Sequence, residues 1–485
     1  MISSAECTIL AALLLLTCGS LAAEPGAPER SIQAQDLVAA VRSGEALSYD
    51  NITITGEMNL SGLQGPVRQP IRITNSHFRG PARFEGVVFS EPLEISGCTF
   101  QDNVSFAKAQ FLGDARLSGT RFLEQADFGY ASFGGVAYFT DAQFLKDCSF
   151  GSVVFGGDAI FSGSTFDRDV DFNFAQFSRL SSFWNASFED VSFLESQFAG
   201  HTTFLDARFY GNATFAGTRF ESDVVFRSAQ FLEGSTFGLS SFEGLADFGD
   251  VHFNRTAFFG GVKFSDLAYF VNSRFEGDLI MEEARFYSMR LDNATFADGS
   301  RIDLDSADFT KFVVHWDVIR ERMVYNGAAY LALVKNYRSL EWFDDADDCY
   351  YQYRRISQDR EPWGWAKLYD IISWLSCGYG VRVSYTIFWC LFTILFFGVI
   401  FWAGKGMNKF EIEGVEIPGN SGLRPSSRVS LTDAMYFSIA MFTTSQAPVN
   451  TYPVGFYRHL AMAEGILGWF FLGLFVVVLS GVLIR

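Results

Sequence analysis

In the middle of the chain, large apolar residues recur with a fixed spacing. From Phe78 to Phe296 the steps between them alternate between six and five residues, and nearly all of these positions are phenylalanine, a residue that occurs 54 times. A mean step of about 5.5 residues fits neither the period of an α-helix nor the two-residue alternation of a long strand. The spacing therefore predicts a stack of short, repeated units instead of an ordinary helical or sheet domain.

A small side chain stands two residues before most of these positions, as in Ala126-x-Phe128. Residues two apart lie on one face of an extended segment, so each unit is expected to be a short strand with both side chains inward, followed by a turn. Stacked units bury a continuous core that no single unit could form. The one break in the alternation, two steps of five over Phe188–Phe198, predicts a tightened corner.

Residues 78–310 resemble the pentapeptide-repeat family in its phenylalanine-rich form, whose unit is a small, a polar and a large apolar residue followed by two variable ones. The resemblance implies an all-β fold, a right-handed four-sided β-helix (a pentapeptide-repeat solenoid), to which we assign residues 51–310. If four units form a coil, a coil has about 22 residues and there are roughly ten to eleven coils. Cys98 and Cys148 take small-residue positions and are expected to be core thiols.

Two shorter segments precede the repeat. Residues 31–50 are expected to form a capping helix, with Ser31 as its N-cap and Gly44 at its end. The apolar run Ile9–Ala23 predicts a signal peptide over residues 1–23, although no basic residue precedes it. A cleaved signal would place the β-helix outside the cytoplasm, which we expect, whereas a retained leader would orient it inward.

After the repeat, the chain becomes helical and then apolar. Residues 317–362 are expected to form a helical linker, and residues 363–382 an interfacial helix with tryptophans at headgroup level. Residues 385–403 and 465–484 carry no charge, and each is long enough to cross a membrane core of about 30 Å. The sequence therefore predicts a multi-pass protein of the cell membrane.

Between the two expected spans, residues 431–453 have the pattern of a short helix that ends in two threonines and an irregular segment. Ser430 or Thr432 can cap this helix, with Asp433 in its first turn. The run from Asp433 through Tyr436 to Thr444 resembles the pore helix of two-transmembrane potassium channels. The resemblance implies that residues 383–485 form an ion-channel-like domain with a re-entrant pore helix, assembled as a homotetramer.

The residues at the expected filter differ from those of a potassium channel. Thr443, Thr444, Ser445, Gln446, Ala447 and Pro448 stand where that family has Thr-Thr-Val-Gly-Tyr-Gly. Filter glycines permit the backbone angles that turn carbonyls toward the ion, and neither glutamine nor proline replaces them cheaply. Potassium selectivity by a carbonyl ring is therefore not expected.

Glu464 is the one acidic residue near the second expected span. Two interpretations of it stay open. Its carboxylate could line the pore mouth or pair with Arg458, or it could be a solvated charge at the start of a helix. Together with Asp433 and Tyr436 it completes the candidate residues outside the filter.

Composition excludes several classes of function. A net charge of −18 argues against nucleic acid as a partner, and the scattered cysteines and histidines show no metal-ligand spacing. No catalytic motif is present, so we predict no enzyme activity, cofactor or metal.

Two hypotheses for the function remain, and the lipid bilayer is a partner in both. The first is an oligomeric cation channel with a non-standard filter and a β-helical sensor that binds an unknown ligand or protein. The second is a non-conducting, membrane-anchored β-helix scaffold that uses the pore module to oligomerise.

Overall fold

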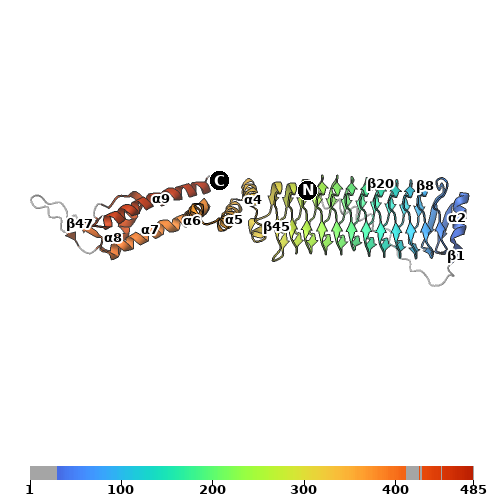
Figure 1. Cartoon of the computed structure of the whole chain (residues 1–485), viewed down its shortest axis with the longest axis horizontal. Coiled ribbons are helices and arrows are strands. Elements are labelled where there is room, and N and C mark those ends of the chain that lie inside the picture. Colours follow the sequence, from blue (N-terminus) through green and yellow to red (C-terminus); the bar gives the residue numbers. More distant parts are fainter. Residues whose placement is uncertain (1–29, 411–424, 427–428, 449–450, 484–485) are drawn as a thin grey trace, which may run out of the picture. The chain divides into compact units, whose positions relative to one another are not determined.

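The structure is a computed structural model that describes residues 30–410, 425–426, 429–448 and 451–483 (Figure 1). The chain forms two compact units that divide within residues 215–222. Both contain short parallel strands, and the second also contains the C-terminal helices. The expected signal peptide, residues 1–23, lies outside the described residues.

Most strands of the first coils have four residues, whereas those of the regular repeat have two. β1 (Arg30–Gln33) pairs in parallel with β3 (Ile52–Thr55), and β2 (Leu47–Asp50) pairs with β5 (Ile71–Thr74). β4 (Met58–Asn59) pairs with β7 (Ala82–Arg83). The fold therefore extends the solenoid by two strands on the N-terminal side of β6 (His77–Phe78) in the same sheet.

The helix at this end is shorter than expected. α2 (Ala34–Ser43) follows β1 and ends at Gly44, whose φ of 81° is a left-handed conformation that glycine adopts without steric cost. The prediction that Ser31 is the N-cap is wrong, because Ser31 lies in β1 opposite Thr53 and the cap position is Gln33. A strand here gives the backbone of residues 30–33 hydrogen-bond partners along the edge of the first coil.

The regular part of the chain is a β-solenoid of about 13 turns, with 13 strands in one of its sheets. β6 to β39 (Ala257–Phe258) are two residues long, and up to β36 (Ser241–Phe242) each pairs in parallel with the fourth strand after it. For example, β10 (Thr99–Phe100) pairs with β14 (Arg121–Phe122), so that Phe100 lies opposite Phe122. Equivalent residues therefore lie one coil apart, as the repeat predicts.

The alternation of six and five follows from two kinds of turn. In the five-residue step from Phe106 to Phe111, the Ala109 N–H donates to the Phe106 carbonyl at 2.9 Å and Lys108 has a φ of 58°. This is a tight turn with a left-handed third residue, the position that glycine and asparagine favour. The six-residue step from Phe100 to Phe106 contains no such residue and makes a wider turn.

The break in the alternation gives a shorter coil. Val170 pairs with Val191, 21 residues later, whereas Val104 pairs with Ala126, 22 residues later. The wide turn after Phe188 has lost one residue, and the strand pairing is kept, so the predicted tightening is confirmed. The pattern breaks a second time after Phe286, where the sequence reasoning had missed it, and β41 (Arg274–Phe275) again pairs with β44 (Thr295–Phe296) 21 residues on.

The core of the solenoid consists of columns of stacked rings. Phe128, Phe150 and Phe172 lie one above another, with ring centroids 4.8 Å apart and planes within 5° of parallel. Neighbouring columns meet edge to face, as Phe139 and Phe150 do at 5.4 Å. Both geometries are favourable for aromatic pairs. Cys98 and Cys148 are buried free thiols in this core, as expected.

The second unit continues from the last coils into the helices of Figure 1. The longer strands β40, β43 and β46 are followed by a short helix, α3, and, in the part of the chain that the structure describes, by seven further helical elements with a small sheet among them. Their bounds are β40 (Lys263–Tyr269), β43 (Arg285–Arg290), β46 (Asp308–Val313), α3 (Trp316–Ile319), α4 (Gly327–Ser339), α5 (Phe343–Arg360), α6 (Trp365–Cys377), η1 (Gly378–Gly380), α7 (Val383–Ala403), β47 (Met407–Phe410), β48 (Pro425–Ser426), α8 (Leu431–Thr444), β49 (Thr451–Pro453) and α9 (Tyr457–Leu483).

α4 closes the open edge of the last coil. The buried Asn336 side chain accepts from the Phe312 N–H at 2.9 Å and donates to the Phe312 carbonyl at 2.8 Å. These two bonds satisfy backbone groups of β46 that a further coil would otherwise satisfy. α4 begins at Asn326, whose side chain accepts from the N–H groups of Ala328 and Ala329.

Candidate functional site

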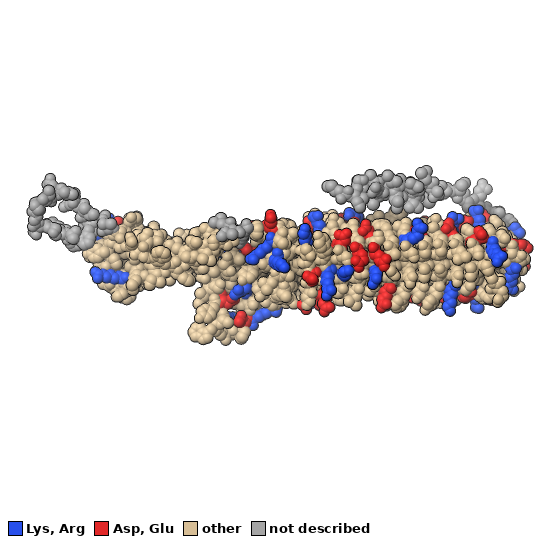
Figure 2. All heavy atoms as spheres, turned by 90° about the horizontal axis from the view of Figure 1, so that it is seen from above, with Lys and Arg blue, Asp and Glu red and all other residues tan. Residues whose placement is uncertain are grey.

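α7 and α9 are long, apolar and largely uncovered. α7 has 21 residues and α9 has 27, and only 28% and 22% of their most apolar stretches are buried. A core helix of a water-soluble domain would bury most of that surface, and soluble proteins rarely expose apolar patches of this extent. Figure 2 shows few charged side chains on the helical module that contains α7 and α9, and many on the solenoid. The two helices are therefore candidate membrane-spanning helices.

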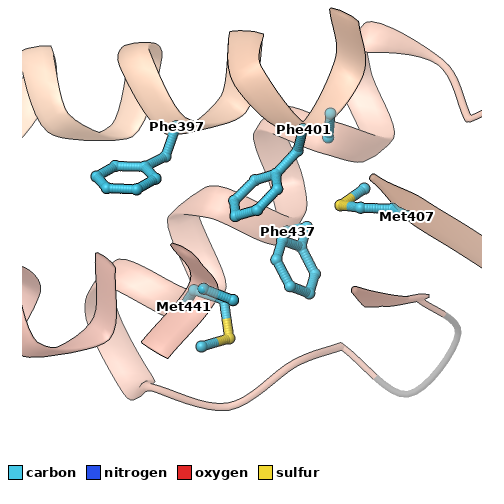
Figure 3. Close-up of a cluster of buried hydrophobic side chains, with 7 residues drawn as sticks. Phe397, Phe401, Met407, Phe437 and Met441 are labelled. Carbon is cyan, nitrogen blue, oxygen red and sulfur yellow. The ribbon is translucent and has the colours of Figure 1, made fainter. Parts of the chain in front are cut away.

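α8 lies between α7 and α9, and a cluster of buried side chains holds it there (Figure 3). Phe397 and Phe401 come from α7, Phe437 and Met441 from α8, and Met407 from β47. The rings of Phe401 and Phe437 meet edge to face at 5.1 Å. This packing places the expected pore helix against both candidate spans.

Glycines let the backbones of α8 and its neighbours approach closely. A Cβ at Gly468 of α9 would lie 2.1 Å from the carbonyl oxygen of Phe442, and one at Gly398 of α7 would lie 2.4 Å from Met435 Sδ. No side chain fits at the first position without movement of the backbone. Small residues of this kind are typical of helix contacts in membranes.

Asp433 fixes the start of α8. Ser430 Oγ accepts from the Asp433 N–H at 3.1 Å while the Asp433 carboxylate accepts from the Ser430 N–H at 3.1 Å, a reciprocal capping box. Lys409 of β47 donates to the other carboxylate oxygen at 2.8 Å. The hydrogen bond from Lys409, and next that from Ser430, lower the pKa of Asp433. Of the two caps that the sequence allowed, Ser430 and Thr432, the structure has Ser430, and Asp433 is an anchored anion.

The expected filter residues follow the last turn of α8. Thr443 and Thr444 turn their hydroxyls back to the carbonyls four residues earlier, at 2.7 Å each. Ser445 has a φ of 53°, and its N–H donates to the Met441 carbonyl at 3.0 Å, which ends the helix. From Thr443 to Ala447 the side chains are exposed, and Pro448 is half-buried. Residues 449 and 450 of the expected pore loop lie outside the described residues.

An open hollow of about 580 Å³ lies beside this end of α8. Its walls are mainly apolar and come from α8, the segment after it and α9; among them are Met441, Ser445, Ala447, Pro453, Gly465 and Trp469. In the described part of the single chain, the polar end of α8 and this apolar wall are thus both exposed. Asp433 lies in the first turn of α8, at the end opposite to this hollow. Tyr436 lies one turn further along α8, and its side chain is 64% exposed.

Glu464 lies in neither of the places that the sequence suggested. α9 begins at Tyr457, two turns before the expected span, so Glu464 is inside the helix and fully buried. Its carboxyl contacts the Ser438 hydroxyl of α8, while Arg458 donates to the Pro453 carbonyl instead. The predictions of a mouth-lining or solvated charge are therefore wrong. Sequence reasoning also missed Ser438, although a serine within an apolar helix face was a usable signal.

Fold and site together define a β-solenoid joined to a helical module with two candidate membrane-spanning helices. Residues 73–121, 117–165, 128–176, 204–252 and 237–285 match the family described as pentapeptide repeats (9 copies). The solenoid is therefore a pentapeptide-repeat solenoid. No curated protein and no solved structure matches the chain.

Proposed function

We propose that the chain is an integral membrane protein in which α7, α8 and α9 of four copies form a cation channel with a non-standard filter. The observation that carries the proposal is the placement of α8. A short capped helix is packed between two largely uncovered apolar helices, and its polar C-terminal end, Thr443–Gln446, is exposed. Among the described residues of a single chain this end is exposed, whereas four copies would bring four such ends together.

The path of the chain supports a re-entrant position for α8. At 14 residues, α8 is about 21 Å long, too short to cross a membrane core of about 30 Å. β47 follows α7, β49 precedes α9, and the two strands pair antiparallel with Met407 opposite Pro453. The chain therefore leaves and returns at one end of the helix pair, and in a membrane α8 would enter and exit on that side.

The end of α8 favours cations. Its last carbonyls carry the partial negative charge of the helix dipole, and the hydroxyls of Thr443 and Thr444 add oxygen ligands nearby. Without glycines in Ser445–Pro448 the proposal includes no potassium selectivity. The absence of glycine from Ser445–Pro448 also favours the second candidate function, a non-conducting scaffold in which the helical module serves only for oligomerisation.

The rest of the chain fits the same proposal. α6, with exposed Trp365 and Tyr369, would lie at the membrane interface. The pentapeptide-repeat solenoid, in its right-handed four-sided form, would stand outside the cytoplasm as a sensor for a ligand or protein, without catalytic activity of its own.

Reconstitution of the purified full chain in planar bilayers tests the channel. We expect a conductance whose reversal potential follows the cation gradient. Gln446→Lys should reduce it, because four added positive charges would surround the path of the ion, whereas Gln110→Lys on the exposed surface of the solenoid should leave it unchanged. An oligomeric, folded protein that stays silent with every cation would contradict the channel and favour the scaffold.

A further inference from the structure

Glu464 occupies the place where α7, α8 and α9 meet. Its side chain is fully buried, and one carboxyl oxygen, Oε2, has no hydrogen-bond partner among the residues that the structure describes. The other oxygen contacts Ser438 Oγ of α8, and Ser438 Oγ is also 2.8 Å from the Ile394 carbonyl of α7. A carboxyl group in a membrane module is costly and is commonly functional.

Two hydrogen bonds link the Glu464 carboxyl, the Ser438 hydroxyl and the Ile394 carbonyl, and each needs a hydrogen of its own. The Ser438 hydroxyl has one hydrogen, and the Ile394 carbonyl can only accept, so the hydrogen on Ser438 serves Ile394. The contact between Ser438 and Glu464 then needs a second hydrogen, which only the carboxyl group can carry. If Glu464 were ionised instead, its charge would be fully buried with Oε2 unpaired.

We propose that Glu464 is a proton-binding site, occupied at neutral pH, and that its bound proton ties α9 to α8 and α7. Glu464 donates to Ser438 Oγ, and Ser438 donates to the Ile394 carbonyl. Loss of the proton leaves a buried carboxylate that draws water between the helices. Because Ser438 and Thr443 lie on the same short helix, the position of the candidate filter then depends on the proton. This inference does not require that the module conducts.

No neighbouring charge compensates Glu464 among the described residues. The other titratable side chains of the three helices are Tyr385, Cys390, Asp433, Tyr436, Tyr457, Arg458 and His459. Asp433 is held by Lys409 and Ser430 at the far end of α8, and Arg458 donates to the Pro453 carbonyl. A basic partner would have favoured the carboxylate, and none of these contacts Glu464.

Infrared spectroscopy of the full chain in lipid nanodiscs tests the site, because a protonated carboxyl absorbs apart from carboxylates and amides. We expect this band in the wild type at neutral pH and its loss in Glu464→Gln. Asp433→Asn is the matched control and should keep the band, since Asp433 is ionised. Absence of the band in the wild type, or its persistence in Glu464→Gln, would overturn the proposal.

A second variant covers the case in which Glu464→Gln does not fold. Ser438→Ala removes the acceptor of the carboxyl proton, so the band should remain and shift to higher frequency. An unshifted band would show that Glu464 does not donate to Ser438. The stabilisation of the helix contacts by the proton is tested by the midpoint of thermal unfolding. This midpoint should fall for the wild type between about pH 6 and about pH 9 and stay level for Glu464→Gln. Equal slopes would refute the role of the proton in holding the helices.

Discussion

Adding one methyl group at Gly468 is expected to push α8 away from α9. The new Cβ would lie 2.1 Å from the carbonyl oxygen of Phe442, 2.8 Å from its carbonyl carbon and 2.9 Å from its Cα. All three are backbone atoms of a helix, so no side-chain rotation relieves the clash. On the same helix, a Cβ at Gly473 would meet nothing within 4 Å. Gly473→Ala is therefore the matched control for Gly468→Ala.

The comparison of the two variants isolates the contact. Each replacement gains about 1 kcal/mol of helix propensity, because alanine loses less backbone entropy than glycine. Gly468→Ala also pays an overpacking cost of about 1–3 kcal/mol, with the upper part expected for a rigid backbone neighbour. The propensity terms cancel in the difference, so Gly468→Ala should be less stable than Gly473→Ala by about 1–3 kcal/mol.

Reversible unfolding of the full chain in mixed micelles, followed by tryptophan fluorescence, measures this difference. The proposed channel adds a second readout, since displacement of the end of α8 should lower the conductance of Gly468→Ala alone. If the two variants agree within about 0.5 kcal/mol, Phe442 does not contact α9 at Gly468, and the placement of α8 is refuted.

Two further predictions concern the solenoid and the start of α8. Phe172 is fully buried, with ring centroids 4.8 Å from those of the coils before and after, so Phe172→Ala should destabilise by about 3–5 kcal/mol in thermal unfolding. Phe174→Gly should gain about 1 kcal/mol, because Phe174 is exposed with a φ of 58°; equal losses in both would contradict the assigned inward face. Lys409 and Ser430 lower the pKa of Asp433, so its contribution to stability exists above the unfolded-state pKa and is lost as the pH falls through the folded-state value. Asp433→Asn should remove that acid-dependent part of the unfolding midpoint, and an identical acid profile in both proteins would exclude the anchored anion.

The sequence predicted the solenoid well because the information is local and repeated. Most of the regularly spaced phenylalanines lie two residues after a small one, and most five-residue steps contain their own turn, so one unit explains its neighbours. The ends of the repeat were harder to predict. Arg30–Gln33 forms a strand because a neighbouring strand, β3, offers it an edge, and nothing within those four residues shows this.

In the helical module, too, features with a local cause could be predicted from the sequence, and features that depend on distant residues could not. The start of α8 could be predicted because Ser430 and Asp433 cap it with their own side chains. The burial of Glu464 could not be predicted, because it depends on Ser438 and Ile394, which belong to two other helices. A polar residue in an apolar helix indicates that a partner exists without identifying it.

The contacts between the solenoid and the first apolar helix bear on the proposed sensor role. α4 closes the last coil through Asn336, and α5 packs on α4. Arg382, directly before α7, pairs with Asp348 of α5 at 2.7 Å and lies over the ring of Tyr351. Tyr351 in turn contacts the hydroxyl of Tyr385 in α7. A displacement of the last coil would therefore reach α7 through side chains that are already paired, without passing along a flexible linker, and a sensor that acts on the pore requires such a connection.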